Sequence, residues 1–483
     1  MRKLILLSMI ALALGGCTVG PNYVRPTVDT PPSWRMTDAE AKDVANSAWW
    51  GQFNDPVLDN LIGSALQENL DLQIASARVD EFAGRYGFVR ADLFPQVGAS
   101  AFAGRQKFTE ETGNPIPPGT NFTLNSYSAV LNAGWELDIW GRIRRATEAA
   151  RAELVASEEG RRAVILSLVG SVAGSYVNLR DLDRQLEIAK ETARTRGESL
   201  GIFKLRFESG FTSEVEYAQV KSQYEEAMAV IPAVEKAITQ QENALCVLLG
   251  RNPGPIPRGK TIDELVLPSV PAGLPSDLLA RRPDILLAEQ NLVAANARIG
   301  VAKAAYYPAI SLTGFFGFAS ADLSNLFTGP AKVWSYGVPV TMPIFTAGKI
   351  AGDVQAAEAI QRQALFGYRQ SIQTAFREVD DSLADQARTR EQLAAQGRQV
   401  EALQKYVELA QLRFDNGYTS YLEVLDAQRT LFSVQLSYTQ NQGVLFQALI
   451  NLYKAMGGGW VTEADKLTAG ATGPAPTAPP AGK

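Results

Sequence analysis

The sequence predicts a mainly α-helical chain that also carries membrane-type β-strands, arranged as one structural unit that occurs twice. The first sign is an internal repeat, because 205–213 (LRFESGFTS) returns as 412–420 (LRFDNGYTS), offset by about 207 residues. The second is the order of patterns, since each copy runs strand, strand, very long helix, tight turn and helix. A duplication of this length indicates two similar units lying side by side. Such a shape is unusual for an enzyme and natural for a tube.

The composition argues against metal, cofactor and nucleic-acid chemistry. The 483 residues carry a formal net charge of −5 and contain no histidine. This charge gives no support for a nucleic-acid partner, and the missing histidines remove the commonest metal ligand and the usual general base. We therefore expect no cofactor, no metal site and no catalytic residue.

The N-terminus has the pattern of an export signal. Two basic residues precede the apolar stretch 4–14, and 14–17 (LGGC) supply small residues at its end. One interpretation is an ordinary signal peptide that happens to contain a cysteine. The favoured one is a resemblance to the bacterial lipoprotein box, which is cut before Cys17 so that this residue carries a diacylglycerol and an N-acyl lipid. Thr18 stands where lipoproteins kept at the inner membrane carry aspartate, which favours the outer membrane.

Two hairpins of amphipathic strands are expected. From Tyr127 to Trp140 the side chains alternate between an apolar and a polar face, and the second copy alternates likewise over 334–344. This alternation is typical of a strand with one apolar and one wet face. A soluble sandwich is the alternative, but only four strands, in two hairpins separated by about 170 residues of helix, argue against it. Pro339 and Pro343 remove ladder donors and are expected to mark a bend or an end of the strand.

Long helices follow both hairpins. The stretch from Thr346 to Phe414 contains no proline, and at 1.5 Å per residue it would be about 100 Å long. Each long helix ends at the repeated turn, where Gly210 and Gly417 supply the helix-ending conformation and the Thr-Ser pairs cap the returning helix. Past the signal there is no run of 18 apolar residues, so we expect only strands to cross a membrane.

These patterns divide the chain into six parts. They are a signal peptide (1–16), a lipidated N-terminal arm (17–54), a first repeat (55–250, with a hairpin over about 95–140 and helices over about 70–91 and 141–250), a linker (251–276), a second repeat (277–460, with a hairpin over about 308–345 and helices over about 284–306 and 346–456), and a mostly disordered C-terminal tail (461–483).

The strand count predicts association of several chains. Small barrels need about eight strands, so four cannot close one. An open sheet edge is not tolerated in lipid. Two chains would supply eight strands, three would supply twelve and four would supply sixteen. Alanine-rich faces on the long helices allow close side-by-side contact, so a ring of helices would continue the ring of strands.

Several motifs together resemble the outer-membrane factor (TolC-like) family. They are 20–23 (GPNY), 279–285 (LARRPDI) and both turns. Members are the exit ducts of tripartite efflux pumps, and the resemblance is to the lipoprotein branch that serves resistance-nodulation-division (RND) transporters. It implies a homotrimer with a 12-strand β-barrel in the outer membrane of a Gram-negative bacterium, continued by a periplasmic α-helical barrel. The arm, the linker and the C-terminal region would form an equatorial belt. A periplasmic adaptor protein, an inner-membrane RND transporter and outer-membrane lipid are the implied partners.

The resemblance also assigns a gate at the periplasmic end. It implies that Leu422 forms an apolar constriction and that Glu423 and Asp426 form acidic rings, one copy per subunit. Residues three or four apart share a helix face, which is compatible with this role. The alternative is an ordinary solvated helix face.

The two turns are the expected contacts of the adaptor. The alternative is that their residues only cap helices, which we expect for the glycines in any case. The implied contact residues are Arg206, Gly210, Thr212, Arg413, Gly417 and Thr419.

A passive exit duct opened by its partners is therefore the predicted function, with drugs or other small toxic solutes as cargo. A lipid-anchored periplasmic scaffold or adhesin would explain the helices and the lipid but leaves the two amphipathic hairpins unexplained. An enzyme is remote, because the chain lacks the site motifs.

Overall fold

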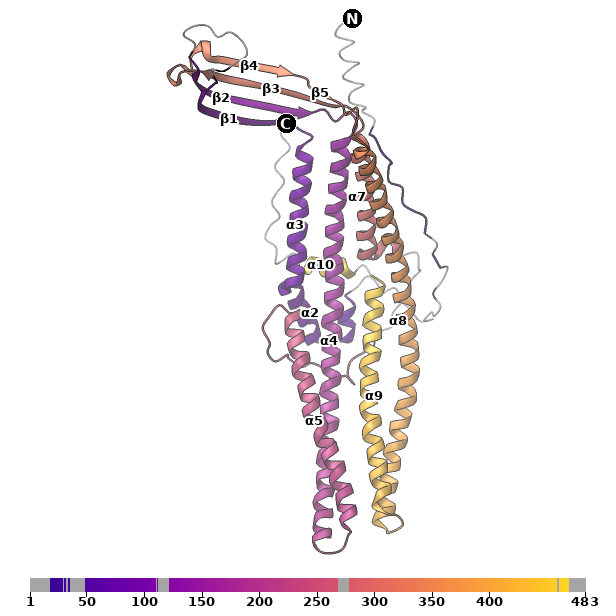
Figure 1. Ribbon diagram of the computed structural model, residues 1–483. Helices are drawn as coiled ribbons and strands as arrows, with labels where there is room; N and C mark the ends of the chain where they lie inside the picture. Colours follow the sequence, from indigo (N-terminus) through magenta and orange to yellow (C-terminus); the bar gives the residue numbers. More distant parts are fainter. Residues whose placement is uncertain are drawn as a thin grey trace. The chain divides into compact units, whose positions relative to one another are not determined.

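The computed structural model describes residues 18–28, 30–31, 34, 48–109, 111, 121–267, 278–457 and 460–468 (Figure 1). The chain divides into two compact units. The first, here the strand unit, contains Met1–Thr27, Arg78–Ser157 and Leu287–Tyr368. The second, the helical unit, contains Val28–Ala77, Glu158–Leu286 and Arg369–Lys483. Both copies of the repeat contribute to each unit.

The strand unit holds one antiparallel sheet. Its strands are β1 (Gln96–Lys107), β2 (Thr123–Glu136), β3 (Ala309–Ser320), β4 (Lys332–Gly337) and β5 (Val340–Thr341). They lie in the order β1-β2-β3-β4, and β5 also pairs with β3. The β2–β3 pairing therefore joins the hairpin of the first repeat to that of the second. Pro339 lies between β4 and β5, as predicted for a bend, and its carbonyl still accepts from Ser311 N at 3.1 Å.

The sheet register confirms the alternation of faces. Leu131 lies opposite Phe316, and Phe316 lies opposite Trp334. The Trp334 side chain is 65% exposed, and its ring stacks on Tyr336 at 5.8 Å between centroids. The rest of the described chain leaves this apolar face of the sheet uncovered. Such a face is stable only where it contacts another apolar surface.

The N-terminal arm is fixed where the strands meet the helices. Asp138 accepts from the backbone nitrogens of Ile143 and Arg144 at 2.9 and 2.8 Å, which starts the long helix α4 (Arg142–Glu208). Val19 N donates to Trp140 O at 3.0 Å. The Arg145 guanidinium donates to the carbonyls of Val19 and Gly20 and to Asn22 Oδ1, the last at 2.7 Å. The first described residues of the chain are therefore held at this junction.

The helices repeat in length as well as in order. The long helices α4 and α8 (Lys349–Asp415) have 67 residues each, and the returning helices α5 (Glu214–Leu248) and α9 (Tyr421–Ala455) have 35 each. A 67-residue helix is about 100 Å long. The remaining helical segments are η1 (Trp49–Phe53), α2 (Pro56–Glu68), α3 (Leu70–Ala91), α6 (Leu278–Arg281), α7 (Pro283–Ala304), η3 (Leu323–Asn325), η4 (Gly329–Ala331) and α10 (Trp460–Thr468). Helix α10 occupies the start of the predicted tail, and residues 469–483 lie outside the described residues.

Helix α4 contains a strongly apolar segment, although the chain past the signal has no uninterrupted run of 18 apolar residues. By length and composition one of its 18-residue windows could cross a membrane, with a mean hydropathy of 1.3, yet 61% of that window is buried inside the protein. Val169, Val172 and Tyr176 on this helix are almost fully buried. These side chains are covered by the protein itself, as in the core helix of a soluble domain.

Short segments fasten the middle of the helical unit. Trp49 stacks on Tyr453 of α9 at 4.8 Å and meets Trp460 of α10 edge-on at 6.0 Å. The fully buried Asp55 caps α2 and also accepts from Tyr176 Oη at 2.7 Å and from Lys260 N at 3.0 Å. Because its partners come from α4 and from the 251–267 segment, one carboxylate connects three distant parts of the chain.

Candidate gate at the two helix turns

The two repeated turns have the same backbone. Gly210 and Gly417 have φ angles of +74° and +75°, a left-handed conformation that disfavours residues with a Cβ. In the first turn Phe211 N donates to Arg206 O at 2.8 Å, and in the second Tyr418 N donates to Arg413 O at 2.9 Å. These bonds satisfy the last carbonyls of α4 and α8. The glycines therefore have the helix-ending role that the sequence indicated.

A carboxylate ties each turn to the start of the returning helix. In the first repeat Ser213 and Glu216 form a reciprocal capping box at the start of α5. Thr212 Oγ1 also donates to Glu216, and the hydrogen bonds from Thr212 and Ser213 lower the pKa of the Glu216 carboxyl. Thr212 thus bonds to a residue of its own chain.

Glu423 is the counterpart of Glu216, but it forms no capping box, because the Ser420 side chain makes no cap bond; the expected Ser cap is present only in the first turn. Its Oε2 accepts from Thr419 Oγ1, and its Oε1 accepts from Arg413 Nη1 at 2.9 Å. The Glu423 side chain is 24% exposed. Both carboxylate oxygens are therefore used within the chain, at the position where a carboxylate stabilises the start of a helix.

The two arginines of the turns differ although the repeat makes them equivalent. The Arg206 guanidinium lies 5.7 Å from the Phe203 ring and 5.9 Å from the Phe414 ring. Phe414 also meets Tyr421 edge-on at 4.9 Å. Arg206 therefore covers an aromatic cluster that joins the first hairpin to the second, whereas Arg413 stays within its own hairpin.

The start of α9 presents an exposed stripe with charges. Leu422 is 57% exposed, while Tyr421 and Val424 beside it are buried. Asp426 Oδ1 accepts from Arg429 Nη2 at 2.7 Å, and both side chains are more than half exposed. Residues at i, i+4 and i+7 share a helix face, so the stripe consists of Leu422, Asp426 and Arg429.

This charged stripe occurs in one repeat only. The equivalent positions of the first repeat hold Val215, Gln219 and Ser222, which carry no charge. The family resemblance assigned a role to Asp426 but none to Arg429. Sequence reasoning therefore missed Arg429 as the partner of Asp426. The bond from Thr419 to Glu423 was missed as well, although alignment of the two repeats pairs it with Thr212 and Glu216. Within the parts of the chain that the structure describes, no three His, Cys, Asp or Glu side chains gather into a metal site.

The predicted lipid site, Cys17, lies outside the described residues. Its neighbour Thr18 is described, and Thr18 Cα lies 3.0 Å from the place that a Cβ on Gly141 would take. Gly141 has a φ angle of +77° and immediately precedes α4. The residue that follows Cys17 is thus packed against the strand–helix junction.

The comparisons with known proteins agree along nearly the whole chain. The model of a family described as outer membrane efflux protein matches residues 61–251 and 274–458. The chain is 38% identical over 457 residues to a solvent efflux pump outer membrane protein of Pseudomonas putida, covering 93% of this chain and 97% of the relative. It is 36% identical over 459 residues to a cation efflux system protein of Escherichia coli, covering 93% and 98%.

Solved structures show the same fold. The open state of the Neisseria gonorrhoeae MtrE outer membrane channel superimposes with a TM-score of 0.82 at 31% identity, covering 92% of this chain and 99% of that one. The Campylobacter jejuni CmeC outer membrane channel gives a TM-score of 0.86 at 25% identity, covering 93% and 98%.

Proposed function

The chain belongs to the outer membrane efflux protein family, and from that premise we propose how its residues serve a gated exit duct. It is the outer-membrane channel component of a tripartite efflux pump and not an enzyme. It resides in the outer membrane of a Gram-negative bacterium, with a large periplasmic helical portion. Channels of this family are trimeric and work with an adaptor and an inner-membrane transporter. The scaffold interpretation is thereby set aside.

We propose that the periplasmic gate is formed by the stripe at the start of α9. Three copies of Leu422 would form an apolar constriction, and three copies of Asp426 would form an acidic ring. The observation that carries this proposal is that exposed charge occurs on the second returning helix and not at the matching positions of the first. Glu423 would act chiefly by fixing the start of α9, since both of its oxygens are already engaged.

Bilayer conductance of the purified trimer tests the gate. We expect small currents from the wild type and larger ones from the Leu422→Ala/Asp426→Ala variant. The matched control is Val215→Ala/Gln219→Ala, which changes the equivalent positions of the first repeat and should leave the current unchanged. Equal effects of the two double variants would place the gate elsewhere. Acidic rings attract cations, so the open duct should have a reversal potential that favours cations.

The adaptor is proposed to contact the two turns through exposed apolar side chains that recur in both repeats. Phe211 and Tyr418 occupy the same position in the turn and are 85% and 77% exposed. Arg413, Thr212 and the other turn residues would support this surface through their bonds within the chain. A Phe211→Ser/Tyr418→Ser variant should lose pump activity while its trimers stay intact. Loss of trimers would show that these two rings serve assembly instead.

The lipid on Cys17 is proposed to sit at the membrane boundary, because Thr18–Asn22 are bonded to the junction of β2 and α4. Mass spectrometry of the mature protein should find a diacylglycerol and an N-acyl chain on this residue. An unmodified N-terminus would refute the proposal.

The cargo is proposed to be small toxic solutes, since the relatives' names mention solvents, antibiotics and cations.

A further inference from the structure

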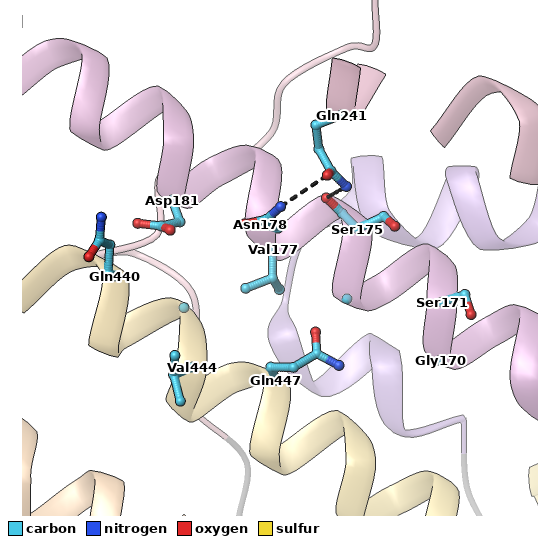
Figure 2. Close-up of a pocket in the computed structure, with 12 residues that line it drawn as sticks. Gly170, Ser171, Ser175, Val177, Asn178, Asp181, Gln241, Gln440, Val444 and Gln447 are labelled. Carbon is cyan, nitrogen blue, oxygen red and sulfur yellow. Dashed lines mark hydrogen bonds between the residues drawn. The ribbon is translucent and has the colours of Figure 1, made fainter. Parts of the chain in front are cut away.

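A polar groove separates helices α4 and α9 within the helical unit (Figure 2). Its volume is about 520 Å³, and α5 contributes Gln241 to its wall. At the edges of the groove the two helices come close together at Gly174 of α4 and Gly443 of α9. A Cβ on Gly174 would lie 2.5 Å from Gln447 Oε1, and a Cβ on Gly443 would lie 3.4 Å from the Asp181 carboxyl. The volume lies in the range of small-molecule sites, which is roughly 300–1,000 Å³.

Asp181 forms part of this groove and has no ion-pair partner among the described residues. The residue is 6% exposed. Its Oδ2 accepts from Gln185 Nε2 at 3.0 Å, while its buried Oδ1 has no hydrogen-bond partner among the described residues. Burial raises the pKa of this carboxyl to about 6. At pH 7 most copies are therefore ionised, and a buried carboxylate with an unpaired oxygen calls for a cation or an ordered water.

The charged side chains nearest in sequence are committed elsewhere. Arg180 donates to Lys260 O at 2.8 Å and to Asp183 at 2.6 Å. Arg184 pairs with Glu187 at 3.0 Å and with Asp263 at 3.3 Å. The residues that line the groove from α5 and α9 carry no charge. Among the described residues no basic side chain is hydrogen-bonded or ion-paired to Asp181, although the Lys454 side chain lies beside Gly170, another residue of the groove wall.

The groove also offers carbonyl oxygens to a donor. Gln440 Nε2 donates to Gln185 Oε1 at 3.3 Å, and Gln447 Nε2 donates to Asn451 Oδ1 at 3.2 Å. Their amide oxygens accept from no described residue. Figure 2 shows Asp181 and Gln440 near each other at one end of the groove, with Gln447 and Ser171 further along. Val444 is 50% exposed and adds an apolar surface.

We propose that this groove binds a small organic cation, with its ammonium group near Asp181 and the Gln440 amide oxygen and its apolar body along Val444. An ammonium group brings only donors, which suits a carboxylate and amide oxygens. A divalent metal is disfavoured, because Asp181 is the only acidic side chain among the described residues that line the groove. A second protein chain is also disfavoured, because Asp and Ser side chains, which line part of this groove, are depleted at protein interfaces. The site goes beyond the gate, since it uses none of the gate residues.

Saturation-transfer NMR on the full-length trimer in detergent tests the site, with benzylammonium as the probe and benzyl alcohol as its neutral analogue. We expect the wild type to bind benzylammonium at least ten times more tightly than the alcohol. Asp181→Asn should abolish that preference, because it keeps the shape and removes the charge. Glu187→Gln is the matched control on α4, since it removes an exposed charge, and it should bind like the wild type. Asp426→Asn changes the proposed gate instead of the groove. This variant should bind benzylammonium like the wild type.

Four outcomes would overturn the proposed cation site. Equal binding of the amine and the alcohol would do so, as would an undiminished preference in Asp181→Asn. Loss of the preference in Asp426→Asn alone would move the cation site to the gate. Absence of binding in the wild type would show that water or a neighbouring subunit occupies the groove.

Discussion

Replacing Asp181 by Asn should stabilise the protein at neutral pH. The carboxyl has an ordinary pKa of 3.8, and burial in the folded chain raises it to about 6. A group whose pKa rises on folding adds stability below its unfolded pKa, and that contribution is lost as the pH rises through the folded pKa. A rise from 3.8 to about 6 corresponds to about 3 kcal/mol per chain at pH 7. Asp181→Asn removes the ionisation and therefore this loss.

The assay is denaturation of the detergent-solubilised trimer, followed by circular dichroism in a buffer without amines. Amine buffers are avoided because they could occupy the groove. We expect Asp181→Asn to be more stable than the wild type at pH 7, by up to about 3 kcal/mol per chain, and to lose most of that advantage near pH 4. Glu187→Gln, at an exposed position of the same helix, should behave like the wild type at both pH values.

Two results would contradict this expectation. An advantage of the same size at pH 4 and pH 7 would mean that the substitution acts through packing and not through ionisation. A variant less stable than the wild type at pH 7 would mean that the carboxylate has a cationic partner in the assembled trimer. Either result would also remove the main support for an organic cation in the groove.

Three further predictions concern contacts within the chain. Ser213→Ala should destabilise the first turn by about 1 kcal/mol, because it removes half of a capping box, and hydrogen exchange at the start of α5 measures this. Arg145→Gln should release the N-terminal arm, which limited proteolysis would detect, since the guanidinium holds three oxygens of residues 19–22. Arg282→Met should reduce the yield of folded trimer, because the buried guanidinium pairs with Asp284 and Glu378, each at 2.7 Å, and donates to Ala455 O at 2.8 Å; the two carboxylates left behind are 40% exposed, so the cost is about 1–3 kcal/mol. Normal yield of that variant would show that the pair is dispensable.

The sequence by itself determined the repeated architecture. The returning motif, the period-two alternation around Tyr127–Trp140 and the glycines of the turns are local patterns, and local patterns fix strands, faces and helix ends. The alternation of strand faces and the two 67-residue helices follow from them, whereas the β2–β3 pairing that joins the two hairpins does not. The family resemblance then supplied the trimer and the pump partners, which composition and spacing had left open.

Only the tertiary structure decided which partner each polar side chain takes. Arg206 and Arg413 are equivalent in the repeat, yet one covers an aromatic cluster and the other binds Glu423. Asp181 stands in the charged segment 180–184 (RDLDR), which is typical of a network of surface ion pairs. Its neighbours pair with each other or with distant segments, and the carboxyl is buried against α9 without a cation among the described residues. The physical reason is that periodicity is set by nearby residues, whereas burial and pairing depend on side chains from helices far apart in the sequence.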